Sequence, residues 1–206
     1  FIDLIEGLIL DQKKIKIKNK DELIQYSYHV AGTVGLMMSK IIGVKDRKAS
    51  QSAIDLGIAM QLTNIARDVY EDSKMERIYL PAEWIPEISL NNLTDLSESN
   101  AHKDEKISNA ILKVISLSEK FYKNGFAGLK YIPISTRLGI FIAANVYRGI
   151  GIKIKSNKKK YLRERVYLNL FEKSFITIKS ILIFIFFPLM NFQYQKIRDS
   201  LPNEDL

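Results

Sequence analysis

The sequence predicts an all-α protein, and three observations support that class. Apolar residues recur at spacings of three and four, the spacing of one helix face, along most of the 206 residues. No segment shows the alternating pattern of strands joined by hairpin turns, and no internal repeat is visible. Hydrophobic residues make up 47% and charged residues 26%, which is the balance of a globular domain. At this length we expect a single domain, residues 1–206, with a sizeable core.

The first elements are a short amphipathic segment and a long helix. Residues 1–7 have the pattern of part of an amphipathic helix. After a Lys-rich turn, a helix is predicted over residues 22–42. Asn19 or Asp21 can cap it, and Gly43 ends it.

The second long helix is predicted over residues 48–72. Its apolar stripe consists of Ile54, Ile58, Leu62, Ile65 and Val69. A loop is predicted over residues 73–86, because a residue that precedes proline resists helical geometry and this occurs at Leu80 and again at Ile85.

The second half of the chain predicts further helices. In order, we expect a polar loop with a short helix over 87–104, a helix over 107–129, a helix over 135–154 capped by Ser135 or Thr136, and one or two helices over 157–187.

Composition excludes several kinds of site. The absence of Cys excludes a disulfide framework, a thiolate metal site and a cysteine nucleophile. The two histidines, His29 and His102, lie far apart in the chain, so we do not expect a histidine-built zinc site. A bound metal would therefore be held by carboxylates.

The net charge of +8 does not indicate a nucleic-acid partner, because the lysines are spread along the chain without a platform of stacking aromatics. The chain begins at Phe1 without a basic, cleavable leader, and we expect the N-terminus of a longer protein to be missing. The longest apolar run, residues 181–190, is shorter than the about 20 residues of a membrane span. It predicts a buried or interfacial helix.

A row of polar side chains lies on one face of the helix predicted over 48–72. Gln61, Asn64, Asp68 and Asp72 follow one another at spacings of three, four and four. Two carboxylates one turn apart repel each other unless a divalent cation lies between them. Mg²⁺ prefers such oxygen ligands and takes the others from water and substrate phosphates. With Arg67 as a fixed cation, the row predicts a site that binds and ionises a diphosphate.

Several small residues lie inside the helix predicted over 22–42. Glycine inside a helix costs about 1 kcal/mol relative to alanine, so Gly32 and Gly35, with Ala31, need a compensating role. Close packing of two helices and room for a ligand explain them equally well. On the second interpretation Gly32 and Gly35 are substrate-binding positions, and one or two side chains of residues 36–38 point into the same cavity.

Three segments carry a family resemblance. They are Tyr26-Ser-Tyr-His-Val-Ala-Gly-Thr-Val-Gly35, Gln61-Leu-Thr-Asn-Ile-Ala-Arg-Asp-Val-Tyr-Glu-Asp72 and Arg77-Ile-Tyr-Leu-Pro81. In order and spacing they resemble the squalene/phytoene synthase family, most closely its bacterial phytoene synthases. The resemblance implies the isoprenoid-synthase fold, in which helices surround a deep apolar cavity.

The resemblance also implies roles for individual residues. Asp68 and Asp72 match the second of the family's two aspartate-rich motifs, and the first is absent here. Asp68, Asp72 and Asn64 would hold the metal. Gln61 and Arg67 match residues around the diphosphate, and Tyr26 matches an active-site tyrosine. Further along the chain, Tyr147 matches a tyrosine near the other substrate, and Arg165 matches an arginine that contacts diphosphate.

The implied reaction is the head-to-head condensation of two prenyl diphosphates through a cyclopropyl diphosphate. For two C20 substrates the product is phytoene, with Mg²⁺ or Mn²⁺ and without NADPH. Two alternatives remain open. One is a squalene or dehydrosqualene synthase that uses C15 substrates; His29 disfavours it, since eukaryotic squalene synthases tend to carry Tyr there. The other is a non-catalytic helical module, which the missing first motif favours.

The partners expected from this interpretation are prenyl diphosphates. We expect a cytoplasmic protein that can contact the inner surface of the membrane through its apolar, basic C-terminal region. The oligomeric state does not follow from the sequence.

Overall fold

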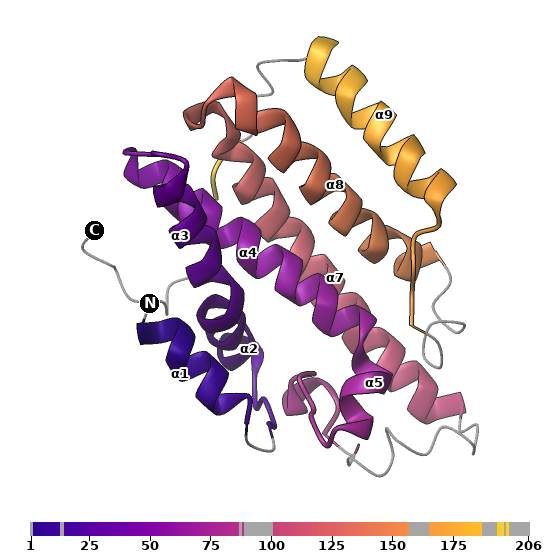
Figure 1. The fold of residues 1–206 in the computed structure, drawn as a ribbon. Helices are drawn as coiled ribbons and strands as arrows, with labels where there is room; N and C mark the ends of the chain where they lie inside the picture. The colour runs from indigo at the N-terminus through magenta and orange to yellow at the C-terminus, as the bar shows by residue number, and fades with distance from the viewer. Residues whose placement is uncertain are drawn as a thin grey trace.

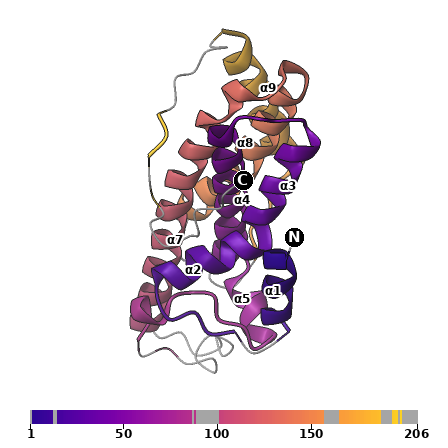
Figure 2. The ribbon, with the colours of Figure 1, turned by 90° about the vertical axis from the view of Figure 1, so that its left-hand side faces the viewer.

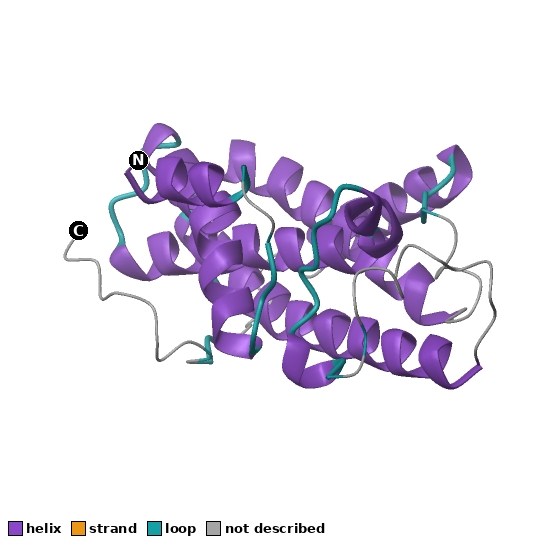
Figure 3. Cartoon of the chain, turned by 90° about the horizontal axis from the view of Figure 1, so that it is seen from below, coloured by secondary structure: helices purple, strands orange, loops and turns teal. Residues whose placement is uncertain are grey.

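The computed structural model describes residues 2–12, 15–86, 88, 101–156, 165–186, 193–195 and 197. Within these residues every element is helical, as predicted, and no strand is present (Figure 3). The α-helices are α1 Ile2–Leu10, α2 Lys20–Ser27, α3 Thr33–Ile41, α4 Arg47–Arg67, α5 Val69–Lys74, α7 Ala101–Ala127, α8 Ile134–Ser156 and α9 Leu170–Phe186. A π-helical turn, Tyr28–Gly32, joins α2 to α3.

The long helices lie side by side, with α4 packed along α7 at the centre (Figure 1). On one side of α4 lies α3, and on the other lies α8, whose outer side carries α9. Ile58 and Leu62 of α4 and Val114 and Phe121 of α7 are fully buried in the core. The shorter helices α1, α2 and α5 gather at one end of the molecule (Figure 2).

The helix predicted over 22–42 is present as α2, the π turn and α3. Asn19 caps it, as its side chain accepts a hydrogen bond from the backbone N–H of Glu22 at 2.9 Å. Its C-terminus is at Gly43, which has a φ of +82°. The N–H of Val44 bonds the carbonyl of Ser39 at 3.0 Å, the pattern of a glycine-terminated helix.

The helix predicted over 48–72 is interrupted. It is capped by Asp46, begins at Arg47 and ends at Arg67. Asp68 has a φ of −103° and a ψ of 14°, outside helical geometry, and α5 begins after it. The N–H of Asp72 still bonds the carbonyl of Asp68 at 2.8 Å, so the two aspartates remain one turn apart despite the break.

The later helices differ from prediction at their ends. α7 begins at Ala101, before the predicted residue 107, and the expected loop over residues 87–104 otherwise falls largely outside the described residues. The predicted cap of α8 is wrong. The helix begins at Ile134, directly after Pro133, and the hydroxyl of Thr136 donates to the carbonyl of Pro133. Of the predicted tail, α9 is described.

Small residues of the π turn, α3 and α4 bring these segments close together. A Cβ placed on Gly35 would collide with the carbonyl of Ala53, and one on Gly57 would collide with the carbonyl of Ala31. A Cβ on Gly32 would press against the side chains of Ile54 and Ile58. Helix packing, one of the two interpretations of these glycines, is therefore present.

Candidate active site

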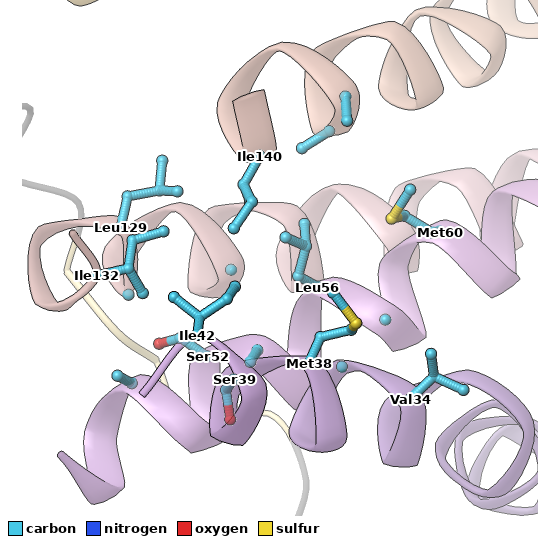
Figure 4. A pocket seen from close by; sticks show the side chains of 18 of the residues that line it. Val34, Met38, Ser39, Ile42, Ser52, Leu56, Met60, Leu129, Ile132 and Ile140 are labelled. Atoms are coloured by element: carbon cyan, nitrogen blue, oxygen red, sulfur yellow. The ribbon is translucent and has the colours of Figure 1, made fainter. Parts of the chain in front are cut away.

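An apolar cavity of about 420 Å³ lies between α3, α4, α7 and α8 (Figure 4). Gly35 is among its lining residues, so helix packing and cavity formation coexist at this position. Gly32 packs against α4 and is not among the residues that line the cavity. The helices predicted over 22–42 and 48–72 thus line one cavity, as expected.

Among Leu36, Met37 and Met38, only Met38 lines the cavity. In Figure 4 its side chain extends toward Leu56, between the α3 and α4 segments. Leu36 instead packs against the hydrophobic core. The remaining wall contains β-branched residues, among them Val34, Ile42 and Ile140.

The cavity follows α4 and ends where the polar row begins. Its lining on α4 extends from Ala49 to Met60, about 16 Å at 1.5 Å per residue. Gln61 is the next residue of α4, Asn64 follows on the same helix, and Asp68 comes directly after the end of the helix. An extended apolar molecule in the cavity would therefore have its polar end at this row.

Asp68 is held by two arginines, its chain neighbour Arg67 and the distant Arg165. Arg67 donates from Nε and Nη2 to the two carboxylate oxygens, at 2.8 and 2.6 Å. Arg165 lies 97 residues further along the chain. Its Nε is 2.8 Å from Oδ1 of Asp68. The pKa of Arg67 is raised by its hydrogen bond to Asp68. Arg165, assigned to the site by family resemblance alone, thus reaches it in space.

Asp72 lies in an environment that disfavours its charge. Burial, followed by the repulsion of Asp68, raises the pKa of Asp72 from 3.8 to about 7, and the charge of Arg77 opposes the rise. A divalent cation would remove both penalties, since it replaces lost hydration and separates the two carboxylates.

Asn64 provides an oxygen that is free to act as a ligand. Its Nδ2 donates weakly to Oε1 of Gln61 at 3.4 Å, whereas its Oδ1 is buried and has no hydrogen-bond partner within the described part of the chain. Nowhere in that part do three His, Asp or Glu side chains form a metal cage. Two carboxylates and one amide oxygen fit Mg²⁺, which commonly completes its shell with water and substrate phosphate.

A second polar cluster, which the sequence did not indicate, surrounds Tyr26. The Oδ1 of Asp11 accepts hydrogen bonds from the hydroxyls of Tyr26 and Tyr79, at 2.8 and 2.6 Å. The two tyrosine rings stack with centroids 4.9 Å apart. Arg77 donates to the carbonyl of Asp11 at 2.9 Å. Burial raises the pKa of both tyrosines, that of Tyr79 to about 12, so both are neutral hydroxyls.

This cluster adjoins the aspartates, because the charges of Asp11 and Arg77 both act on the pKa of Asp72. Backbone pairing of residues 15–17 with Ile78 brings Asp11 beside Tyr79, 68 residues away. Arg77 and Tyr79 lie inside a segment that carries the family resemblance, and this resemblance is the sequence signal from which their place near the aspartates could have been predicted.

Tyr147 lies on α8. It is partly buried against the core and close enough to Arg67 to contribute to the pKa of that guanidinium. Together, the structure brings Asn64, Arg67, Asp68, Asp72, Tyr147 and Arg165 to one end of the cavity, with the Tyr26 cluster beside Asp72.

Comparisons with known proteins identify the family of the chain. The model of the squalene/phytoene synthase family matches residues 1–172. The 15-cis-phytoene synthase of Enterobacter agglomerans is 40% identical over 154 residues, which cover 74% of this chain and 50% of that protein. The 15-cis-phytoene synthase of a Paracoccus species is 35% identical over 170 residues, 80% of this chain and 52% of that protein.

Among solved structures, a dehydrosqualene synthase in complex with a ligand has a TM-score of 0.77 and 27% identity, covering 91% of this chain and 65% of that one. A squalene synthase from Alicyclobacillus acidocaldarius has a TM-score of 0.66 at 19% identity, covering 76% of this chain and 59% of that one; this likeness concerns the fold. The chain spans about half the length of the curated relatives it matches. It belongs to the squalene/phytoene synthase family.

Proposed function

We propose that the protein condenses two C20 prenyl diphosphates head to head to form phytoene, in the cytoplasm and next to a membrane. The observation that carries this proposal is an apolar cavity that ends at a row of amide, carboxylate and guanidinium side chains, which are groups suited to a metal-bound diphosphate. The names of the relatives, which are 35 to 40% identical phytoene synthases, support the same reaction.

The metal would be held by Asp68, Asp72 and the free Oδ1 of Asn64. When bound, Mg²⁺ supplies charge that stabilises the departing diphosphate. A diphosphate carries more negative charge than a carboxylate, so it can compete with Asp68 for the guanidinium groups of Arg67 and Arg165. These arginines would then stabilise the leaving group directly.

The cavity and the tyrosines have complementary tasks. The apolar wall excludes water, so an allylic cation left after ionisation is captured by the double bond of the second substrate and not by water. Tyr26 and Tyr79 stay neutral and hold their hydroxyls in fixed positions through Asp11. Because each hydroxyl already donates its one proton to Asp11, it can only accept a further hydrogen bond, and it places no charge beside the aspartates.

A C15 substrate is the second candidate, and the similarity to a dehydrosqualene synthase favours it. The test is to incubate the full-length protein with C20 and with C15 diphosphates in Mg²⁺, without NADPH, and to identify the hydrocarbon by mass spectrometry. We expect a C40 hydrocarbon. A C30 product from the C15 substrate, with no product from the C20 substrate, would favour the second candidate over this proposal. The absence of a hydrocarbon product from both substrates would contradict both candidates.

Substitution of Met38 by Phe tests the preference for the longer substrate. Met38 faces the cavity, and a flexible methionine yields to a long chain more readily than an aromatic ring does. We therefore expect Met38→Phe to reduce turnover of the C20 substrate more than that of the C15 substrate. The control is Met37→Phe, since Met37 is not among the lining residues. Equal losses for both substrates in Met38→Phe would contradict the assignment.

Substitution of Asp11 by Ala tests the tyrosine cluster. Loss of the shared acceptor should free both hydroxyls, and a misplacement of about 1 Å can cost roughly 100-fold in rate. We expect a fall in kcat with little change in KM, partial rescue by Asp11→Asn, and no further loss when Tyr26→Phe is added. The matched control is Asp3→Ala, which removes a similar acceptor from Tyr28. Unchanged kcat in Asp11→Ala would exclude this positioning role.

A further inference from the structure

An ion pair between α7 and α8 lies beside Tyr147 in the chain and has no part in the site described above. Arg148 donates from Nε to both carboxylate oxygens of Glu119, at 2.7 and 2.9 Å, and from Nη2 to Oε2 at 2.6 Å. The hydrogen bonds to Glu119 raise the pKa of Arg148. A two-pronged contact of this kind fixes the direction of both side chains, which a single ion pair does not.

The ion pair belongs to a group of polar side chains that spans α4, α7 and α8. Tyr122 on α7 is 1% exposed, and its hydroxyl lies 3.1 Å from that of Thr63 on α4. Burial raises the pKa of Tyr122. Glu119, Tyr147 and Arg148 all act on this pKa through their charges, so these side chains lie near one another. The ion pair and Tyr147 are therefore neighbours in space as well as in sequence.

Tyr147 continues the face of α8 that lines the cavity. Ala143 and Ala144 are lining residues, and Tyr147 follows them by four and three positions, which places it on the same face one turn further along. This turn lies beside the polar row, because the charge of Tyr147 acts on the pKa of Arg67. Arg148, the next residue, reaches α7 from another face of the same turn. The contact on one face thus sets the direction of the other.

The neighbouring residues of α8 provide little that could hold the rotation of this turn. Gly149 and Gly151 are buried. A Cβ on Gly149 would collide with Ile176 of α9, and one on Gly151 would lie 3.5 Å from Ile115 of α7. The glycines let the helices approach closely but have no side chain that interlocks with them. Since side chains reach about 5–6 Å from a helix axis, a rotation of about 10° moves the ring of Tyr147 by about 1 Å.

We propose that Glu119 and Arg148 are positioning residues, whose ion pair fixes the rotation of α8 and thereby holds the ring of Tyr147 at the polar end of the cavity. The expected effect on turnover rests on the proposed function, whereas the placement of Tyr147 can be measured without the reaction. The two side chains are 30 and 35% exposed, and such a pair contributes little to stability. Its loss should therefore change the site more than the fold.

Fluorine NMR of the full-length protein labelled with 3-fluorotyrosine measures the placement. The chain contains ten tyrosines, and the signal that disappears in Tyr147→Phe is that of Tyr147. Arg148→Lys keeps the positive charge but cannot form the two-pronged contact. We expect the Tyr147 signal to shift or broaden in Arg148→Lys, because the ring then samples more than one position.

Kinetics with the C20 substrate measure the consequence for the reaction. A displacement of about 1 Å can cost roughly 100-fold in rate, and we expect kcat to fall by about tenfold or more in Arg148→Lys and in Glu119→Gln. KM should change little. Tyr147→Ala should cost less in the Arg148→Lys background than in the unsubstituted protein, because the ring is already displaced there.

The ion pair that joins α8 to α9 provides a matched control. Lys153 lies 2.7 Å from Glu172, and their side chains are 26 and 35% exposed. Glu172→Gln removes this pair from the same helix, while glutamine can still accept the hydrogen bond from the N–H of Asn169. This variant should leave both the Tyr147 signal and kcat unchanged.

Three results would overturn the inference. The first is a Tyr147 signal in Arg148→Lys that is identical to that of the unsubstituted protein. The second is a shifted signal with unchanged kcat. The third is an equal change in Arg148→Lys and Glu172→Gln, which would reflect a general loosening of α8. If the unsubstituted protein forms no hydrocarbon, the proposed function fails, and the fluorine signal alone decides whether the ion pair places Tyr147.

Discussion

Replacement of Asp68 by Asn should lower turnover by roughly 100- to 1000-fold, the loss typical when one group that stabilises a leaving charge is removed. The amide keeps the shape of the side chain but removes the charge that holds Arg67 and Arg165 and that would bind the metal. Steady-state kinetics with the C20 substrate measure the effect.

The fold of the Asp68→Asn variant should persist, because the bond from the Asp68 N–H to the Asn64 carbonyl belongs to the backbone. Circular dichroism checks this. The matched control is Asp46→Asn at the other end of α4, where Asn can still accept the capping hydrogen bond from Lys48. Turnover close to that of the unsubstituted protein in Asp68→Asn would remove this residue from the site.

Replacement of Asp72 by Asn should stabilise the protein while it abolishes most of the turnover. The folded state raises the pKa of Asp72 from 3.8 to about 7, so folding takes up a proton between these values. The penalty for the buried charge is absent below pH 3.8, grows as the pH rises toward 7 and is complete above it. Asn carries no charge and escapes the penalty.

Thermal unfolding of the apoprotein measures this gain. The Tm of Asp72→Asn should exceed that of the unsubstituted protein clearly at pH 8 and by less at pH 5. A site that stores electrostatic strain for its ligand behaves in this way, with stability lost for function. A lower Tm at pH 8 would show that the carboxylate of Asp72 stabilises the fold and would contradict its assignment as a strained ligand.

The sequence was sufficient for the elements whose causes are local. Helical periodicity, the Asn19 cap and the Gly43 terminus each depend on neighbours within a few residues. The spacing of Asn64, Asp68 and Asp72 likewise survives the break after Arg67, because the backbone bonds across the break continue the turn.

Other features depend on contacts that no local pattern encodes. Asp11 contacts Tyr79 because residues 15–17 pair with Ile78. Arg165 contacts Asp68 although the two residues are 97 positions apart in the sequence. Gly35 could not be assigned to packing or to the cavity from sequence, since it does both. The sequence shows that the C-terminal region is apolar and basic, but the pattern of α9 does not say which side of the helix is covered.

The central claim is that the end of α4 forms a diphosphate site that requires a metal, and calorimetric titration tests it most directly. Inorganic diphosphate is titrated into the full-length protein with and without Mg²⁺, and into Asp68→Asn and Asp72→Asn as controls. We expect binding to the unsubstituted protein that requires Mg²⁺ and that is lost in both variants. Binding of equal strength without Mg²⁺, or undiminished binding in both variants, would contradict the claim.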